Sequence, residues 1–140
     1  MIIGIGTDLC DIRRIAQSID GFGARFVSRV FTAAEQAYAQ SVAKPEAIYA
    51  KRYAAKEAVM KALGTGLRGF RFPDIEITRD ELGKPQVELR GGAQARLEAL
   101  TPSGHQAQIH LSLTDEWPYA GAYVVIEALS VPQNTPIQAR

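Results

Sequence analysis

Two carboxylates and one lysine are the side chains of this sequence best suited to work on a charged substrate. Asp8 ends a stretch of alternating residues, and Glu57 and Lys61 lie four apart in a segment rich in helix formers. Mg²⁺ is usually held by one or two carboxylates with water and phosphate oxygens, so Asp8 and Glu57 suffice if the fold brings them together. Lys61 would then face the same phosphates. The alternatives are a surface ion pair between Glu57 and Lys61, worth about 0.3 kcal/mol, and a helix N-cap at Asp8.

Glycines accompany both parts of this candidate site. The segment that carries Glu57 and Lys61 ends in Gly64-Thr65-Gly66, which is typical of a helix C-terminus followed by a flexible loop that favours anions. Gly4 and Gly6 occupy one face of the expected first strand, where they indicate the close approach of another backbone or of a ligand. Gly4-Ile5-Gly6 lacks the third glycine of the dinucleotide-binding fingerprint, and the sequence contains no Walker loop.

Three arginines form a local basic patch near the N-terminus, at Arg14, Arg25 and Arg29. The whole chain is nearly neutral, with 16 Lys and Arg against 15 Asp and Glu, so it has no global field for nucleic acid or an anionic membrane. A solvated helix face is the ordinary explanation of the patch. The alternative is a docking surface for an acidic partner.

The framework expected for these residues is one α+β domain, residues 1–129, with a mostly antiparallel sheet, a long central helix and shorter helices. The long helix has an alanine side, Ala50, Ala54 and Ala58, that allows close packing. Thr32 and Glu35 fit a capping box, the only role expected of Glu35. The pattern predicts strands over 1–8, 74–78, 86–90, 108–114 and 119–129, and helices over 11–18, 22–30, 33–41, 46–63 and 93–100.

Composition agrees with a single small domain, because 140 residues that are 46% hydrophobic suit one core. A single cysteine, Cys10, excludes an internal disulfide, and with two histidines it makes no metal cluster. The chain begins without a basic leader, and its apolar runs are far shorter than the roughly 20 residues that span a bilayer. We therefore expect a cytoplasmic protein that contacts no membrane. Residues 130–140, with two prolines, are expected to form a flexible tail.

Five motifs, in order and with suitable spacing, resemble those of the holo-[acyl-carrier-protein] synthases, the small bacterial type of 4′-phosphopantetheinyl transferase. The resemblance covers about residues 1–129, and its most specific part is Lys-Glu-Ala-x-x-Lys-x-x-Gly-Thr-Gly. The motifs are Gly4-Ile5-Gly6-Thr7-Asp8, Phe31 to Glu35, Lys51 to Gly66, Gly83-Lys84-Pro85 and His110 to Asp115.

This resemblance implies a magnesium-dependent enzyme of fatty acid biosynthesis. It would transfer 4′-phosphopantetheine from coenzyme A to a serine of apo acyl carrier protein and release adenosine 3′,5′-bisphosphate. The resemblance also implies a homotrimer whose active sites are shared between neighbouring subunits. The larger relatives carry another acid two residues after the first metal ligand, where this chain has Cys10, so water is expected to take that coordination position.

The resemblance also implies a role for each candidate residue. Asp8 and Glu57 would hold Mg²⁺ on the pyrophosphate, and Lys61 would neutralise phosphate charge. Either Glu57 or a metal-bound water would take the serine proton. Arg14, Arg25 and Arg29 would meet the acidic recognition helix of the carrier protein. The residues implied to bind the adenosine and its phosphates are Lys44, Arg52, Gly64, Thr65, Gly66, Gly83, Lys84, Pro85 and His110.

Two other classes of function are compatible with parts of this pattern. A coenzyme A or nucleotide-binding module would need the phosphate-contacting residues without needing both Asp8 and Glu57. An interaction domain would need the three arginines alone. Neither explains why Asp8, Glu57 and Lys61 occur together within the full series of motifs.

Overall fold

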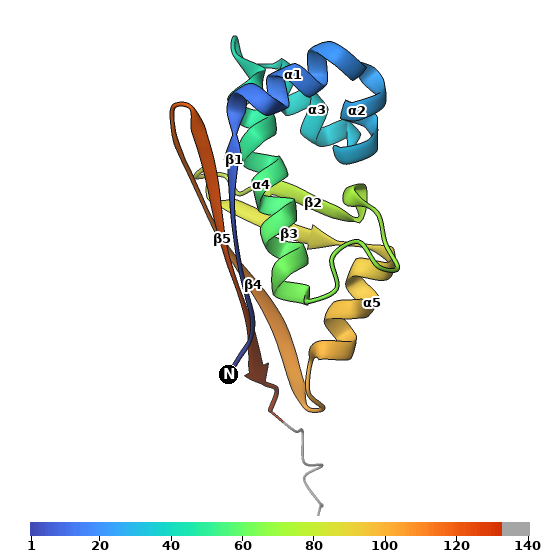
Figure 1. Cartoon of the computed structure of the whole chain (residues 1–140). Helices are drawn as coiled ribbons and strands as arrows, with labels where there is room; N and C mark the ends of the chain where they lie inside the picture. Colours follow the sequence, from blue (N-terminus) through green and yellow to red (C-terminus); the bar gives the residue numbers. More distant parts are fainter. Residues whose placement is uncertain (133–140) are drawn as a thin grey trace, which may run out of the picture.

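A computed structural model describes residues 1–132 and shows a three-stranded antiparallel sheet packed against one long helix (Figure 1). The strands are β1 (Ile2–Asp11), β4 (His105–Glu116) and β5 (Tyr119–Ser130), in the order β1-β5-β4. In the register, Thr7 of β1 lies opposite Tyr123 of β5, which lies opposite Ser112 of β4. Side chains alternate between the two faces of each strand, so one face of the sheet meets the helix and the other is left outside.

The helix on the inner face is α4 (Pro45–Leu63). Its backbone comes so close to β1 that a Cβ on Gly4 would lie 2.3 Å from the carbonyl oxygen of Ala62. A Cβ on Gly6 would lie 1.9 Å from the carbonyl oxygen of Ala58. The close backbone approach predicted from the two glycines is therefore confirmed, and the alanines of α4 make it possible. Gly64 ends the helix in the left-handed conformation, also as expected.

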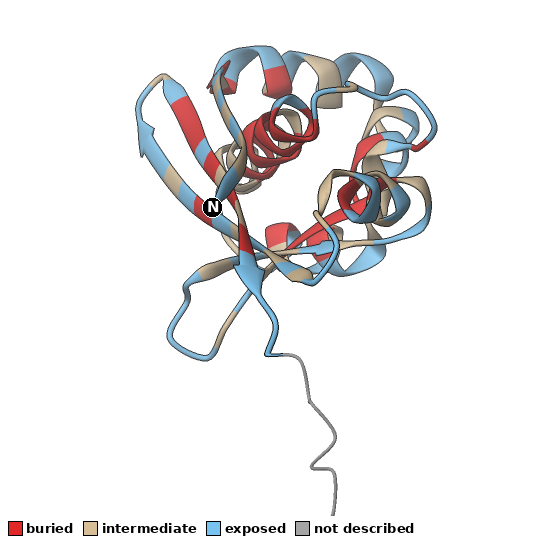
Figure 2. Ribbon diagram, turned by 90° about the horizontal axis from the view of Figure 1, so that it is seen from below, coloured by how far each residue is buried: buried red, intermediate tan, exposed pale blue. Residues whose placement is uncertain are grey.

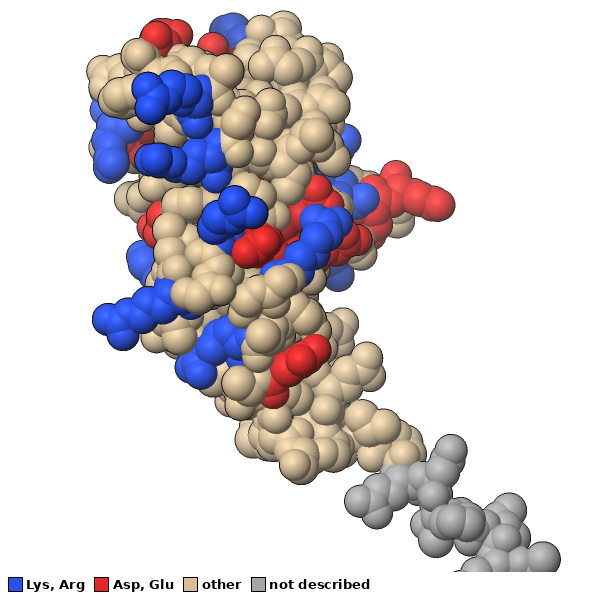
Figure 3. Space-filling model, turned by 90° about the vertical axis from the view of Figure 1, so that its right-hand side faces the viewer, with Lys and Arg blue, Asp and Glu red and all other residues tan. Residues whose placement is uncertain are grey.

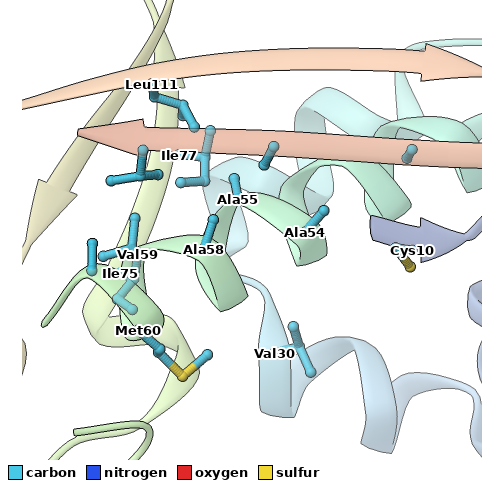
Figure 4. Packing of buried hydrophobic residues seen from close by; sticks show 14 of the residues in the cluster. Cys10, Val30, Ala54, Ala55, Ala58, Val59, Met60, Ile75, Ile77 and Leu111 are labelled. Carbon is cyan, nitrogen blue, oxygen red and sulfur yellow. The ribbon is translucent and has the colours of Figure 1, made fainter. Parts of the chain in front are cut away.

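A two-stranded sheet covers another side of α4, with β2 (Ile75–Arg79) paired antiparallel to β3 (Pro85–Leu89). The 3-10 helix η1 (Phe72–Asp74) precedes β2, and α5 (Gly91–Leu100) follows β3. Figure 2 shows that α4 holds the largest run of buried residues, between the sheets. Figure 4 shows its residues Ala55, Ala58 and Val59 among Ile75 and Ile77 of β2 and Leu111 of β4.

Three shorter helices gather at one end of the molecule (Figure 1), namely α1 (Ile12–Phe22), α2 (Ala24–Val30) and α3 (Ala33–Gln40). The N-cap of α1 is Asp11, whose carboxylate accepts a hydrogen bond from the Arg13 amide. The alternative assignment of Asp8 as a helix N-cap is therefore wrong, because β1 continues three residues beyond it. The predicted capping box of Thr32 and Glu35 is present at the start of α3.

The α+β class, the long central helix and the antiparallel pairing are confirmed. Two strands are longer than predicted, since β1 extends to Asp11 and β4 extends from His105 to Glu116. Most of the predicted tail lies outside the described residues, which end at Pro132. Within them the structure contains no helix that is both long and apolar enough to cross a membrane.

Candidate active site

Asp8 and Glu57, 49 residues apart in the sequence, line one pocket of about 260 Å³ between β1, α1, α2 and α4, called here the carboxylate pocket. Asp8 projects from the inner face of β1, and Glu57 precedes Ala58, the residue of α4 whose carbonyl lies against Gly6. Arg14 and Phe26 also line the carboxylate pocket. The fold therefore brings together the two carboxylates that the sequence analysis selected.

Lys61 contacts Asp8 rather than the carboxylate four residues before it on α4. Its ammonium nitrogen lies 3.3 Å from Asp8 Oδ1 and donates to the carbonyl oxygen of Thr7 at 2.8 Å. The Lys61 side chain is 55% exposed and that of Asp8 17%. The surface ion pair between Glu57 and Lys61, considered above, is not what this geometry shows. A second pocket beside Glu57 and Lys61 is lined by Gly64 and Gly66, so the glycine loop adjoins the carboxylates.

The oxygen donors of the carboxylate pocket fit Mg²⁺ better than a softer metal. Burial and the nearby Asp8 charge raise the pKa of the Cys10 thiol to about 11, so it stays protonated at neutral pH. Burial and the Glu57 charge raise the pKa of the Tyr53 hydroxyl to about 12. Residues 1–132 contain no group of three or more His, Cys, Asp or Glu placed to enclose a metal. Two carboxylates with open positions suit a magnesium ion that also binds substrate phosphates.

A separate pocket of about 460 Å³, the arginine pocket, gathers four basic residues, Lys51, Arg52, Arg79 and Lys84. The guanidinium carbons of Arg52 and Arg79 lie 4.4 Å and 3.8 Å from the ring centre of Tyr38. Arg52 is 4% exposed, and its Nε has no hydrogen-bond partner in the structure. Burial lowers the pKa of Arg52, and the nearby Arg79 charge lowers it further. Among residues 1–132 no acidic side chain lines this pocket, although Lys51 lies 3.3 Å from Asp115 Oδ1, and the pocket has the donors to bind an anion.

The other residues predicted to bind the substrate lie at several different places in the fold. Gly83, Lys84 and Pro85 line the arginine pocket. His110 lies on β4 and its Nε2 is 2.9 Å from Glu127 Oε2. Lys44 is exposed at the N-terminal end of α4, the end farther from Glu57. The Thr65 hydroxyl is buried without a hydrogen-bond partner in the structure.

The three arginines of the basic patch are all exposed on α1 and α2. Arg14 borders the carboxylate pocket, whereas Arg25 and Arg29 flank a hollow of about 520 Å³ that Phe22 and Phe26 also line. Phe22 is 69% exposed. Figure 3 shows basic side chains close together on the upper part of this side of the molecule, the end where Figure 1 places α1 to α3. We call Arg14, Arg25, Arg29 and Phe22 the basic surface.

Sequence reasoning missed two sets of polar residues. Tyr38 and Arg79 complete the arginine pocket, but nothing in their spacing relates them to Arg52. Lys56 and Glu35 form a fully buried ion pair with 2.7 Å between Nζ and Oε1. Glu35 thus has a second role besides its capping box. The available signal for Lys56 was its place among apolar residues of a helix that is buried on several sides.

Comparison with known proteins defines the class of this fold and site. The sequence profile of the 4′-phosphopantetheinyl transferase superfamily matches residues 4–119. A holo-[acyl-carrier-protein] synthase of Bradyrhizobium is 54% identical over 136 residues, covering 94% of this chain and 98% of that protein. The protein of the same name from Phenylobacterium zucineum is 56% identical over 130 residues, covering 92% and 94%.

Solved structures agree with these sequence matches. The crystal structure of holo-[acyl-carrier-protein] synthase from Neisseria meningitidis is 40% identical, with a TM-score of 0.80 over 91% of this chain and 99% of that one. The Bacillus anthracis structure, described as a complex with coenzyme A (3′,5′-ADP), is 32% identical, with a TM-score of 0.73 over 93% and 99%. The chain therefore belongs to the holo-[acyl-carrier-protein] synthase family of 4′-phosphopantetheinyl transferases, as its motifs predicted.

Proposed function

We propose that this chain transfers 4′-phosphopantetheine from coenzyme A to a serine of apo acyl carrier protein, with catalysis at the carboxylate pocket. Family membership supports the reaction. The observation that carries the site is the convergence of Asp8 and Glu57 on one pocket, beside Lys61 and the glycine loop. The reaction supplies a role for each of these groups.

The serine oxygen forms a bond to the phosphorus nearer the pantetheine, and the bond from that phosphorus to the bridging oxygen breaks. Adenosine 3′,5′-bisphosphate leaves, and the serine proton passes to a base. Asp8 and Glu57 would hold Mg²⁺, which supplies charge stabilisation to the pyrophosphate. Lys61, now paired with Asp8, has enough exposure and reach to neutralise a phosphate oxygen. Glu57, or a metal-bound water near it, would receive the proton.

The arginine pocket is proposed to bind the second anionic group of coenzyme A, the phosphate monoester on its ribose. In the proposed reaction the pyrophosphate lies near Asp8 and Glu57. The arginine pocket is then the cationic site available to the monoester. Arg52 and Lys84 would be donors there, because the Nε of Arg52 is buried without a partner. Gly83 and Pro85 border the same space.

The basic surface is proposed to dock the carrier protein. Arg25 and Arg29 would meet acidic side chains of the partner, and the exposed Phe22, which lines the same hollow, offers an apolar anchor of the kind found at interface centres. Arg14 and Phe26 extend this surface to the mouth of the carboxylate pocket. A serine presented here would therefore arrive beside Glu57.

We further propose a homotrimer whose active sites are shared between subunits. Asp8 points to the inner face of the sheet, whereas the register places His110 opposite Val125 and Ile5 on the outer face. The carboxylate and arginine pockets of one chain have no lining residue in common. The outer face exposes several large apolar side chains, which a neighbouring copy would cover: Ile5 70%, Leu9 70% and Tyr123 64%.

Mass spectrometry of an apo carrier protein tests the reaction directly. The carrier protein is incubated with this chain, coenzyme A and Mg²⁺, and a mass gain of one phosphopantetheine is expected. Omitting Mg²⁺ with a chelator should abolish the gain. Absence of any gain across a panel of bacterial carrier proteins would refute the proposed function.

Subunit mixing tests the shared site. At a coenzyme A concentration far below the raised KM of Arg52→Ala, the Arg52→Ala and Glu57→Gln chains are each expected to lose most activity. A mixture that is unfolded and refolded together should regain about a quarter of wild-type activity, because a mixed trimer places an intact Glu57 beside an intact Arg52. Light scattering should give three times the mass of one chain. A monomer, or a mixture without regained activity, would contradict the trimer.

A further inference from the structure

Lys56, the residue before Glu57 on α4, carries a buried charge that the proposed chemistry does not use. Its side chain is 0% exposed. The Nζ donates to Glu35 Oε1 at 2.7 Å, to the carbonyl oxygen of Val30 at 2.8 Å and to that of Phe72 at 3.3 Å. An ammonium group has three N–H donors, so each of them has an acceptor.

Stability alone is a weak explanation for this ion pair. Removing two charges from water is costly, and replacing a buried ion pair with apolar groups of similar volume is often neutral or stabilising. Burial lowers the pKa of Lys56, although the Glu35 charge opposes that shift. What the pair provides, and apolar packing would not, is a fixed set of directional contacts.

Those contacts fix the junction between α2 and α3 to the rest of the fold. Val30 is the last residue of α2, and Glu35 lies in the first turn of α3. Glu35 accepts from the Thr32 amide at 2.8 Å and, through its other oxygen, from the Ile77 amide of β2 at 3.0 Å. Figure 4 shows Val30 at the end of its helix, close to the alanines of α4. The junction is thus held to both α4 and β2.

The position of α2 matters because it carries part of the basic surface. Arg25 and Arg29 belong to this helix, and its Phe26 lines the carboxylate pocket together with Glu57. A helix of seven residues has little stability of its own, so its place depends on such anchors. Lys56 ties the end of α2 to α4, at the position of α4 that immediately precedes Glu57.

We propose that the Lys56–Glu35 pair is a positioning device that holds the basic surface at a fixed place relative to Glu57, and that it thereby sets the affinity for the carrier protein. This inference rests on the proposed function. Both side chains are 0% exposed within the described residues, so their effect on docking would pass through α2 and not through direct contact with the carrier protein. Loss of the pair should weaken productive docking and leave the coenzyme A site intact.

The test is the double variant Lys56→Met with Glu35→Gln. Methionine keeps the length of the side chain without its charge. Glutamine keeps one acceptor oxygen for the Thr32 amide of the capping box, but its NH2 group replaces the oxygen that accepts from the Ile77 amide. We expect a folded protein whose KM for apo carrier protein rises at least tenfold, about 1.4 kcal/mol. The KM for coenzyme A, and kcat at saturating carrier protein, should stay within about twofold of wild type.

Two further variants separate positioning from stability. Ile126→Ala removes buried volume from β5, where Ile126 is 0% exposed and adjoins Gly4 of β1. It should lower the melting temperature while leaving the KM for carrier protein unchanged. Lys56→Met alone leaves Glu35 with its amide donors Thr32 and Ile77 and should raise that KM by about threefold or more. This single variant tests the inference if the double variant does not fold.

An unchanged KM for carrier protein in the folded variants would overturn the inference, because the pair would then be purely structural. A parallel rise in the KM for coenzyme A would also overturn it, since the pair would act on the site as a whole. Wild-type protein that modifies no carrier protein would instead refute the proposed function, so the two failures are distinguishable.

Discussion

Replacing Gly6 with alanine should damage both stability and activity. The new Cβ would lie 1.9 Å from the carbonyl oxygen of Ala58, 2.9 Å from its carbon and 3.0 Å from the Ala62 nitrogen. These are backbone atoms, which no rotamer change can move. Since ordinary contact needs about 3.5 Å, β1 and α4 would have to separate by roughly 1.5 Å. Overpacking of this kind costs about 1–3 kcal/mol, or about 5–12 °C in melting temperature.

The same displacement would separate Asp8 from Glu57, because one lies on β1 and the other on α4. A 1 Å misplacement of catalytic groups can cost about a hundredfold in rate, so we expect kcat/KM to fall about that much. Thermal melting and the carrier-protein mass assay measure the two effects. Gly21→Ala is the matched control: its Cβ would meet no atom within 4 Å, and α1 should be slightly stabilised. Wild-type melting and turnover in Gly6→Ala would refute this reasoning.

Three more outcomes are expected. Glu57→Gln should lose most turnover while staying folded, because an amide replaces a metal-binding carboxylate; steady-state rates against Mg²⁺ concentration and circular dichroism measure this. Arg52→Met should raise the KM for coenzyme A about tenfold or more, with little effect on dephospho-coenzyme A, which lacks the monoester. Burial raises the Cys10 pKa to about 11, so its labelling by a disulfide reagent at pH 8 should be at least about a hundredfold slower than in urea. Labelling should speed up as pH rises toward 11, because only the thiolate reacts.

Each of these expectations has a result that contradicts it. Near-normal activity of Glu57→Gln with Mg²⁺ would remove Glu57 from the metal site. Equal losses of Arg52→Met with both forms of coenzyme A would show that Arg52 does not read the monoester. Fast labelling of folded Cys10 at pH 8 would mean that the inner face of β1 is open to solvent.

Local pattern predicted most of the framework, and physical reasons explain where it stopped. The alternation around Ile3 and Ile5 and the glycine after Leu63 are short-range signals, and the structure bears them out. Strand ends were misplaced because β1 and β4 continue through polar residues such as Asp11, His105 and Glu116, which strand pairing keeps extended without a hydrophobic pattern. Periodicity cannot measure how far a ladder of hydrogen bonds extends.

The residues of the candidate site could be predicted from the sequence and from the resemblance, but their arrangement in space could not. Nothing in the sequence next to Asp8 or Glu57 indicates that α4 crosses β1 at Gly6. That crossing brings the two carboxylates into the same pocket. The same holds for Lys56, because the usual prediction for a lysine on a helix is a solvent-exposed side chain. Only the fold shows that its neighbours bury it. Its partner Glu35 had a sufficient local explanation as a capping residue, which hid its second contact.

Arg52 and Arg79 both lie against the ring of Tyr38, so the arginine pocket holds two positive charges near each other. The aromatic ring attracts both guanidinium groups, but it also keeps two like charges close together, and Arg79 disfavours the charge on Arg52. A bound dianion would relieve that repulsion. Because salt screens the attraction between these guanidinium groups and an anion, rising ionic strength should weaken anion binding in this pocket.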